Sequence, residues 1–127
     1  MKLFFFDIES SGLNYWQHGI HQIAGIIEID GAVVESFDFK VRPNPKAKID
    51  QGALDVAHVT VEQIIAYPPM EEVYRKLIAI LGQYVDKFNK KDKFFTVGFN
   101  NASFDNPFLR AWFKQNGDEY FGSWFWS

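Results

Sequence analysis

The chain has 127 residues, of which 47% are hydrophobic and 18% aromatic, and it carries a formal net charge of −3. It contains no cysteine, which excludes disulfides, thiolate catalysis and cysteine-based zinc sites. The negative charge argues against non-specific nucleic-acid binding, so a phosphate-containing partner must be bound through local features or metal ions. Neither a secretory signal nor a run of about 18 apolar residues is present, and we expect one cytoplasmic domain with no membrane partner.

The N-terminal part of the chain predicts three consecutive strands. Residues 2–9 form a hydrophobic run, and residues 21–30 and 32–41 flank Gly31 in a pattern typical of a β-hairpin with an Asp-Gly turn. Residues 42–50 contain two prolines and alternating charges. This composition predicts a loop after the hairpin.

Two helices are predicted next. Thr60 and Gln63 have the spacing of a capping box, so we expect a short helix that ends before Pro68. Pro69 stands where a first-turn proline is tolerated at the start of a second helix. Apolar residues then recur at spacings of three and four, which predicts a stripe that packs on a sheet. These residues are Met70, Val73, Leu77, Leu81, Tyr84 and Phe88.

The C-terminal part predicts one strand and one helix. Residues 94–99 form the strand, residues 100–103 a polar turn, and a helix begins near Asp105 and ends at Gly117. Residues 120–127 look like the entry to another strand. The apolar side of the helix consists of Phe108, Leu109, Trp112 and Phe113.

This order of elements determines the predicted fold class. Three successive strands favour antiparallel pairing, whereas a later strand reached through helices favours parallel pairing. We therefore expect an α/β protein with a mixed sheet, antiparallel in its first three strands and then parallel, with helices packed on it.

Asp7 and Glu9 stand two positions apart near the end of the first strand. Side chains alternate along a strand, so both carboxylates face the same way, with Cα atoms roughly 6–7 Å apart. Carboxylates that close repel each other, and a divalent cation, Mg²⁺ or Mn²⁺ for hard oxygen ligands, removes the repulsion. The alternative is a solvated strand end, and the motif alone does not exclude it.

Asp105 also has two interpretations. Aspartate is a favoured N-cap and suits the helix dipole, which is a purely structural role. The same residue lies where a strand ends and a helix begins, which is where ligand sites gather in sheets with helical connections.

Both acidic segments resemble the DEDD family of 3′–5′ exonucleases. The resemblance is carried by FFDIESSGL and HQIAGI near the N-terminus and by GFNNASFDNPFL at 98–109. Residues 53–64 are similar to the helix-loop segment that precedes the family's second motif. The family includes oligoribonucleases and the proofreading epsilon subunit of bacterial DNA polymerase III. The resemblance spans nearly the whole chain and implies a ribonuclease H-like fold and a metal-dependent 3′–5′ exonuclease that acts on DNA or RNA.

The resemblance also implies which residues act. Asp7, Glu9 and Asp105 would bind two Mg²⁺ or Mn²⁺ ions and catalyse in-line hydrolysis of the terminal phosphodiester. Leu13 would pack on the terminal base. The residues implied to contact the 3′-terminal nucleotide are Ser10, Ser11, Gly12 and Leu13. Further candidates for lining the substrate groove are His58, Asn101 and Phe104. The structural alternatives are a surface histidine for His58, a turn former for Asn101 and a core residue for Phe104.

The family's third motif is not present in these 127 residues. It consists of a histidine, which acts as general base, and an aspartate five residues later, which binds metal. Here His18, His21 and His58 all precede Asp105. We therefore expect the N-terminal portion of a longer protein, a single domain incomplete at its C-terminal end and inactive by itself.

Two other hypotheses remain at this stage. One is a catalytically inactive nucleic-acid or protein-binding module of the same fold, and the other is a different sheet protein that uses its acids only structurally. An incomplete domain would expose an apolar face and a strand edge, so we expect self-association or low stability, with the aromatic residues 124–126 involved. The sequence does not determine whether a polymerase is a partner.

Overall fold

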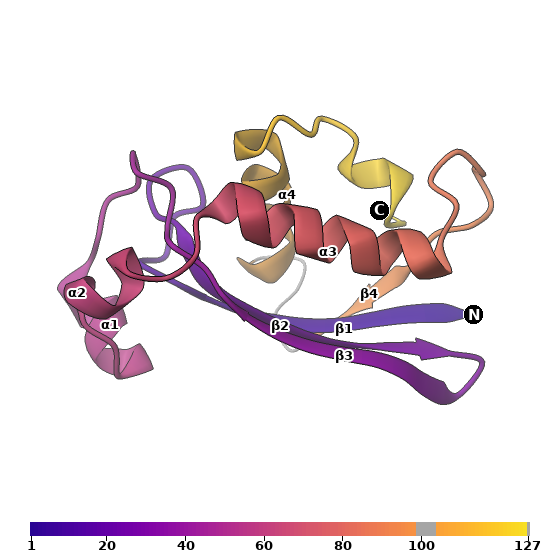
Figure 1. Ribbon diagram of the computed structural model, residues 1–127, viewed down its shortest axis with the longest axis horizontal. Helices are drawn as coiled ribbons and strands as arrows, with labels where there is room; N and C mark the ends of the chain where they lie inside the picture. Colours follow the sequence, from indigo (N-terminus) through magenta and orange to yellow (C-terminus); the bar gives the residue numbers. More distant parts are fainter. Residues whose placement is uncertain (99–103, 127) are drawn as a thin grey trace.

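The computed structural model describes residues 1–98 and 104–126 (Figure 1). Among these, no helix has both the length and the apolar character needed to cross a membrane. The elements in chain order are β1 (Lys2–Ser10), β2 (Ile20–Ile29), β3 (Ala32–Lys40), α1 (Gln51–Ala57), α2 (Val61–Ile65), α3 (Met70–Tyr84), β4 (Phe95–Val97), α4 (Asn106–Gln115) and a 3-10 helix at Phe121–Ser123.

The four strands form one mixed sheet in the order β3-β2-β1-β4. β1 pairs with β2 in antiparallel register and with β4 in parallel register, where Leu3 lies opposite Phe95. The β2–β3 turn uses Asp30 and Gly31 at φ 51° and 87°, the positive values that a tight Asp-Gly hairpin requires. The predicted fold class is confirmed, and β1, which carries the acidic pair, is an interior strand.

The two faces of β1 differ in what covers them. Phe4, Phe6 and Ile8 are buried, whereas Asp7 and Glu9, which alternate with them, are exposed. Figure 1 shows α3 and α4 on one side of the sheet, with α1 and α2 at one end. The buried residues of β1 share one core cluster with those of α3 and α4. The acidic pair therefore lies on the sheet face opposite this core.

The long helix α3 ends earlier than the apolar pattern predicts. Its inward stripe is confirmed as far as Leu81, but the backbone becomes extended at Val85. Lys2 donates to the carbonyl oxygen of Tyr84 and to Asp92 Oδ1, which connects the following loop to β1. Phe88 lies beyond the helix and is 85% exposed, so its predicted place in the stripe is wrong.

The C-terminal tail covers an edge that we expected to be open. Phe94 donates its N–H to the Trp124 carbonyl at 2.8 Å, and Trp126 donates to the Phe94 carbonyl at 2.9 Å. Trp124 and Phe125 are buried in the core, so the expectation that they drive self-association is wrong for these two side chains. Of the strand predicted at 94–99, residues 94–98 are described and Phe95–Val97 form β4, whereas residue 99 lies outside the described residues.

Candidate functional site

Three carboxylates from two segments of the chain share one site. Asp7 and Glu9 project from the same face of β1, where they pair in register with Ala24 and Gln22 of β2. Asp105 precedes α4 and is only 3% exposed. Burial, followed by the charges of Asp7 and Glu9, raises the pKa of the Asp105 carboxyl to about 6. The structure thus brings the three predicted acids within electrostatic reach of one another.

Helix capping does not account for Asp105. Its backbone is helical, at φ −65° and ψ −45°, and its side chain makes no capping hydrogen bond. An N-cap residue has an extended backbone and accepts a bond from the first turn of its helix. The structural alternative for this residue is therefore not supported.

The surroundings of Glu9 shift its pKa in opposite directions. Burial and the charge of Asp7 raise its pKa, whereas the charge of Lys40 lowers it. Lys40 ends β3 and lies opposite Gln22, which in turn lies opposite Glu9. We did not predict this cation. Counting strand positions back from the Asp-Gly turn would have placed Phe39 in this row instead, because the register shifts between Ile27 and Glu28.

The three carboxylates do not form a closed ligand shell. Across residues 1–98 and 104–126, no three acidic or histidine side chains are grouped tightly enough to make a complete metal site. Burial, together with the charges of the neighbouring carboxylates, nevertheless raises the pKa values of both Glu9 and Asp105. Such a site suits a divalent cation with oxygen ligands.

A pocket of about 220 Å³ adjoins Glu9. It brings together several of the predicted substrate-binding residues with two residues of α1 that we did not predict, Ala53 and Val56. Leu13 and Val56 are 78% and 79% exposed. The pocket therefore has two exposed apolar side chains and a carboxylate. Its lining residues are Ile8, Glu9, Ser10, Gly12, Leu13, Ala53, Val56 and Phe104.

The two serines after the acidic pair shape the loop. Ser10 Oγ donates to the Gly12 carbonyl at 2.5 Å. Ser11 Oγ donates to the Lys48 carbonyl at 2.6 Å and accepts from the Gly19 N–H at 3.0 Å. Both hydroxyl protons are thus used within the protein, and Ser11 is not part of the pocket lining.

The remaining predicted residues lie elsewhere. His58 is the exposed C-cap of α1, at φ 58°, and does not line the pocket. His21 is buried on β2, and burial together with the charge of Lys40 lowers its pKa. Asn101 lies outside the described residues.

Gly12 is required by a close approach of His18. A Cβ atom at position 12 would stand 2.2 Å from the His18 ring, whose Nδ1 accepts from the Asn14 N–H at 3.1 Å. We expect Gly12→Ala to destabilise the protein by about 1–3 kcal/mol, because the ring must move. Urea denaturation measures this loss. Gly122→Ala is the control, since a Cβ atom there meets nothing within 4 Å, and equal stability of the two variants would contradict the packing argument.

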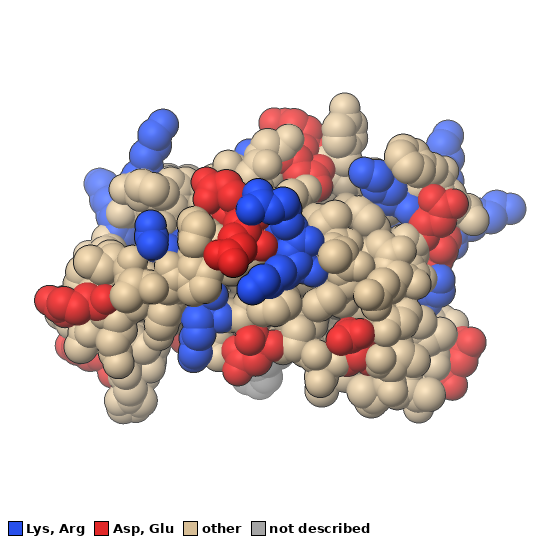
Figure 2. All heavy atoms as spheres, viewed as in Figure 1, with Lys and Arg blue, Asp and Glu red and all other residues tan. Residues whose placement is uncertain are grey.

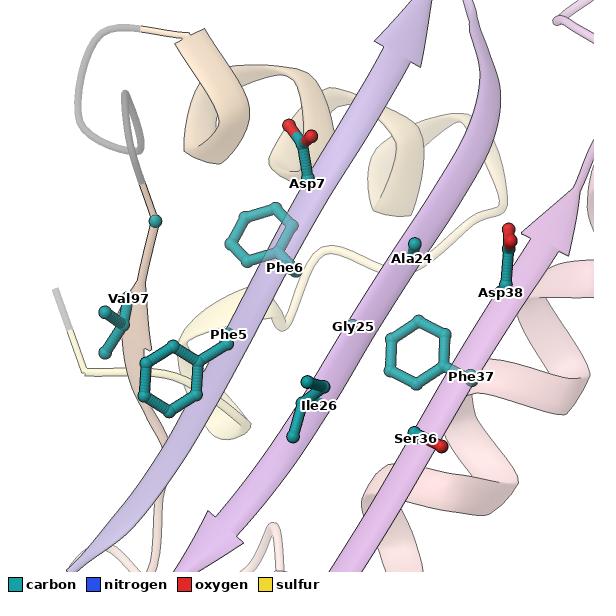
Figure 3. Close-up of a pocket in the computed structure, with 11 residues that line it drawn as sticks. Phe5, Phe6, Asp7, Ala24, Gly25, Ile26, Ser36, Phe37, Asp38 and Val97 are labelled. Atoms are coloured by element: carbon teal, nitrogen blue, oxygen red, sulfur yellow. The ribbon is translucent and has the colours of Figure 1, made fainter. Parts of the chain in front are cut away.

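The sheet face that carries Asp7 also has an open hollow of about 690 Å³. Figure 3 shows Asp7 on β1 and Asp38 on β3, with Ala24 of β2 between them. Asp38 Oδ1 accepts from Gln22 Nε2 at 2.8 Å. The groups that raise the pKa of Asp105 include Asp7 but not Asp38. Asp38 is therefore a nearby carboxylate outside the acidic site.

Sequence comparison supplies a family match and several relatives. A family profile described as an exonuclease, RNase_T, matches residues 4–123. The DNA polymerase III PolC-type of Staphylococcus haemolyticus is 26% identical over 113 residues, which are 88% of this chain and 7% of that protein. The Bacillus cereus counterpart is 24% identical over 114 residues, which are 90% of this chain and 7% of that protein. The chain thus spans a small part of the relatives it matches.

Structural comparison supports the fold. Exonuclease I of E. coli in complex with a dT13 oligonucleotide has a TM-score of 0.78 at 19% identity, covering 99% of this chain and 27% of that chain. The zinc-bound form of its complex with single-stranded DNA gives the same values. This likeness confirms the expected ribonuclease H-like architecture.

Proposed function

The chain belongs to the exonuclease family whose profile it matches, and from this premise we propose that it hydrolyses the terminal phosphodiester at the 3′ end of a nucleic acid with two divalent metal ions. The observation that carries the proposal is the electrostatic coupling of Asp105 to Asp7 and Glu9, since a fold alone does not determine function. DNA is the substrate we favour, because the PolC-type relatives are DNA polymerases by name. The same relatives make a DNA polymerase the partner class we propose.

The three carboxylates fit Mg²⁺ or Mn²⁺. They provide hard oxygen ligands, and their mutual repulsion, which after burial raises the pKa of Asp105, is what a divalent cation would offset. Asp7, Glu9 and Asp105 would hold the ions. When bound, such ions lower the pKa of water and stabilise charge on the leaving 3′ oxygen.

The chain's own residues position the 3′-terminal nucleotide. Leu13 and Val56 offer apolar contacts to the base, and the pocket between them opens toward Glu9. The Ser10 and Ser11 hydrogen bonds fix the loop that carries Gly12 and Leu13. The expected role of the serines is therefore to shape the pocket and that of Leu13 is to contact the base.

Proton transfer requires a general base, and we assign none among these 127 residues. No histidine follows Asp105, and His21 is buried with a lowered pKa. A positioned general base contributes about 10²–10⁴-fold to a rate. We expect little or no release of nucleotides without an added base, and release when imidazole is added as a soluble base. A catalytically inactive nucleic-acid or protein-binding module of the same fold is the second candidate.

The test follows the end of a labelled oligonucleotide on a denaturing gel, with protein in excess and Mn²⁺ present. A 5′ label should give a ladder of shortening products, whereas a 3′ label should give mononucleotide at once. The rates of release from DNA and RNA oligonucleotides of the same sequence show which of the two nucleic acids the protein prefers. Release from the 5′ end would refute the polarity, and binding without release, even with imidazole, would favour the inactive module.

A further inference from the structure

One face of α4 lines a groove of about 540 Å³ that the proposed reaction does not use. Asn106, Arg110 and Lys114 follow one another at intervals of four residues, so they lie on the same side of the helix. The loop after β1 and the C-terminal tail form the rest of the groove. Its lining residues are Tyr15, Asn106, Pro107, Arg110, Ala111, Lys114, Phe121 and Trp126.

The groove carries positive charge that no described acid neutralises. Arg110 and Lys114 are both exposed, and neither forms an ion pair with a carboxylate in the part of the chain that the structure describes. The Arg110 guanidinium carbon lies 4.7 Å from the centroid of the Phe121 ring. This contact restrains the guanidinium and leaves its N–H donors available to an anion.

Aromatic side chains accompany these cations. Tyr15 is 43% exposed and packs edge-on against Trp16, with ring centroids 5.0 Å apart. Trp126 is partly exposed and packs near Phe95. Cations together with exposed rings are what a single nucleic-acid strand requires, because phosphates pair with the cations and unpaired bases stack on the rings.

One end of the groove is next in sequence to the acidic site. Asp105 immediately precedes Asn106, the first groove residue of α4. The helix rises about 14 Å between Asp105 and Lys114 at 1.5 Å per residue. This distance corresponds to roughly two to four nucleotides, at about 3.4 Å per stacked nucleotide or twice that when extended.

We propose that this groove binds the single strand that leads to the 3′ end, with Arg110 and Lys114 contacting its phosphates and Tyr15 its bases. The inference rests on the proposed function, which places the 3′ terminus at the acidic site. The attraction is local, because the net charge of the chain is −3 and Figure 2 shows acidic and basic side chains interspersed on the face it presents.

Fluorescence anisotropy with 5′-labelled oligothymidylates in EDTA tests the groove without cleavage. For the unmodified protein, affinity should rise from the dinucleotide to the tetranucleotide and then level off. Arg110→Gln combined with Lys114→Gln should weaken tetranucleotide binding about 5–30-fold, as expected for two exposed charge contacts. The slope of log affinity against log salt should fall in magnitude by about 1.4, that is, 0.7 per lost phosphate contact. Tyr15→Ser should weaken binding roughly fivefold or more with no change in this slope.

The matched control is Lys90→Gln combined with Lys91→Gln, which removes the same charge from an exposed loop outside the groove. Equal losses in the control and groove variants, or no oligonucleotide binding by the unmodified protein, would overturn the inference. Thermal unfolding confirms that each variant is folded. These measurements do not use nucleotide release, so a protein that binds as expected but releases nothing refutes the proposed function and leaves the groove supported.

Discussion

Replacing Asp7 by asparagine should reduce Mn²⁺-dependent nucleotide release by about 10³-fold or more. Asp7 lies on an interior strand, and its charge acts on both Glu9 and Asp105. Asparagine keeps the shape of the side chain but removes the negative charge that a divalent cation needs. Metal-derived stabilisation of a transition state amounts to several kcal/mol, and each 1.36 kcal/mol is a factor of ten in rate.

Asp38→Asn is the matched control for this variant. Asp38 lies two strands away on the same sheet face, in register with Ala24 and hence with Asp7, but is not among the groups that raise the pKa of Asp105. The measurement is single-turnover release from a labelled oligonucleotide, with imidazole added to bring the rate into range. We expect Asp38→Asn to retain release. Similar rates in the unmodified protein and Asp7→Asn would refute the assignment of the acidic site.

Replacing Asp105 by asparagine should have opposite effects with and without metal. In EDTA near pH 8, the variant should be more stable than the unmodified protein, by up to about 3 kcal/mol for a pKa raised from 3.8 to about 6. Added Mn²⁺ should stabilise the unmodified protein and have little effect on the variant. If Asp105→Asn raises the stability in EDTA and abolishes stabilisation by Mn²⁺, the carboxylate of Asp105 destabilises the fold but is needed to bind the metal.

The pH dependence of this effect has a definite sign. Because the folded-state pKa of Asp105 lies above its unfolded value, protonated Asp105 favours the folded state. Its contribution to stability is complete below about pH 4 and is lost as the pH rises through 6. Glu9, whose pKa is also raised, acts in the same direction.

Denaturant unfolding in EDTA between pH 4 and pH 8 measures this dependence. The free energy of unfolding of the unmodified protein should decrease relative to that of Asp105→Asn as the pH rises, and the gap should be constant above pH 7. If this difference in the free energy of unfolding does not change with pH, the pKa of Asp105 is not raised in the folded protein.

Local patterns predicted most of the fold correctly. The Asp-Gly turn, the Thr60 capping box and the apolar spacing of α3 each depend on residues close in sequence, and all are confirmed. Phe88 was wrongly assigned to the apolar stripe because the helical spacing of apolar residues continues in the sequence beyond Tyr84, where the helix ends. At the end of α3, Lys2 donates to the Tyr84 carbonyl, a contact between residues 82 positions apart that has no local signal.

The candidate site was predictable in part for the same reason. The pairing of Asp7 with Glu9 follows from strand alternation, and the resemblance supplied Asp105. Lys40 and Val56 were missed because they reach the site only through strand register and through the placement of α1. The Ser11 hydroxyl was expected to face substrate, but it donates to the Lys48 carbonyl, a loop contact that sequence spacing does not reveal.

The parallel pairing of β4 with β1 also bears on the stage of folding at which we expect the acidic site to form. Asp7 and Glu9 lie on β1, which pairs with the next strand in the chain, β2. The pairing of β1 with β4, in contrast, joins Leu3 to Phe95, which are 92 positions apart. Closing so long a loop costs more entropy than closing a hairpin, and such contacts slow folding. Asp105 follows β4 in the chain. We therefore expect the acidic site to be among the last parts of the molecule to assemble, and a partly folded chain to carry two acids without the third.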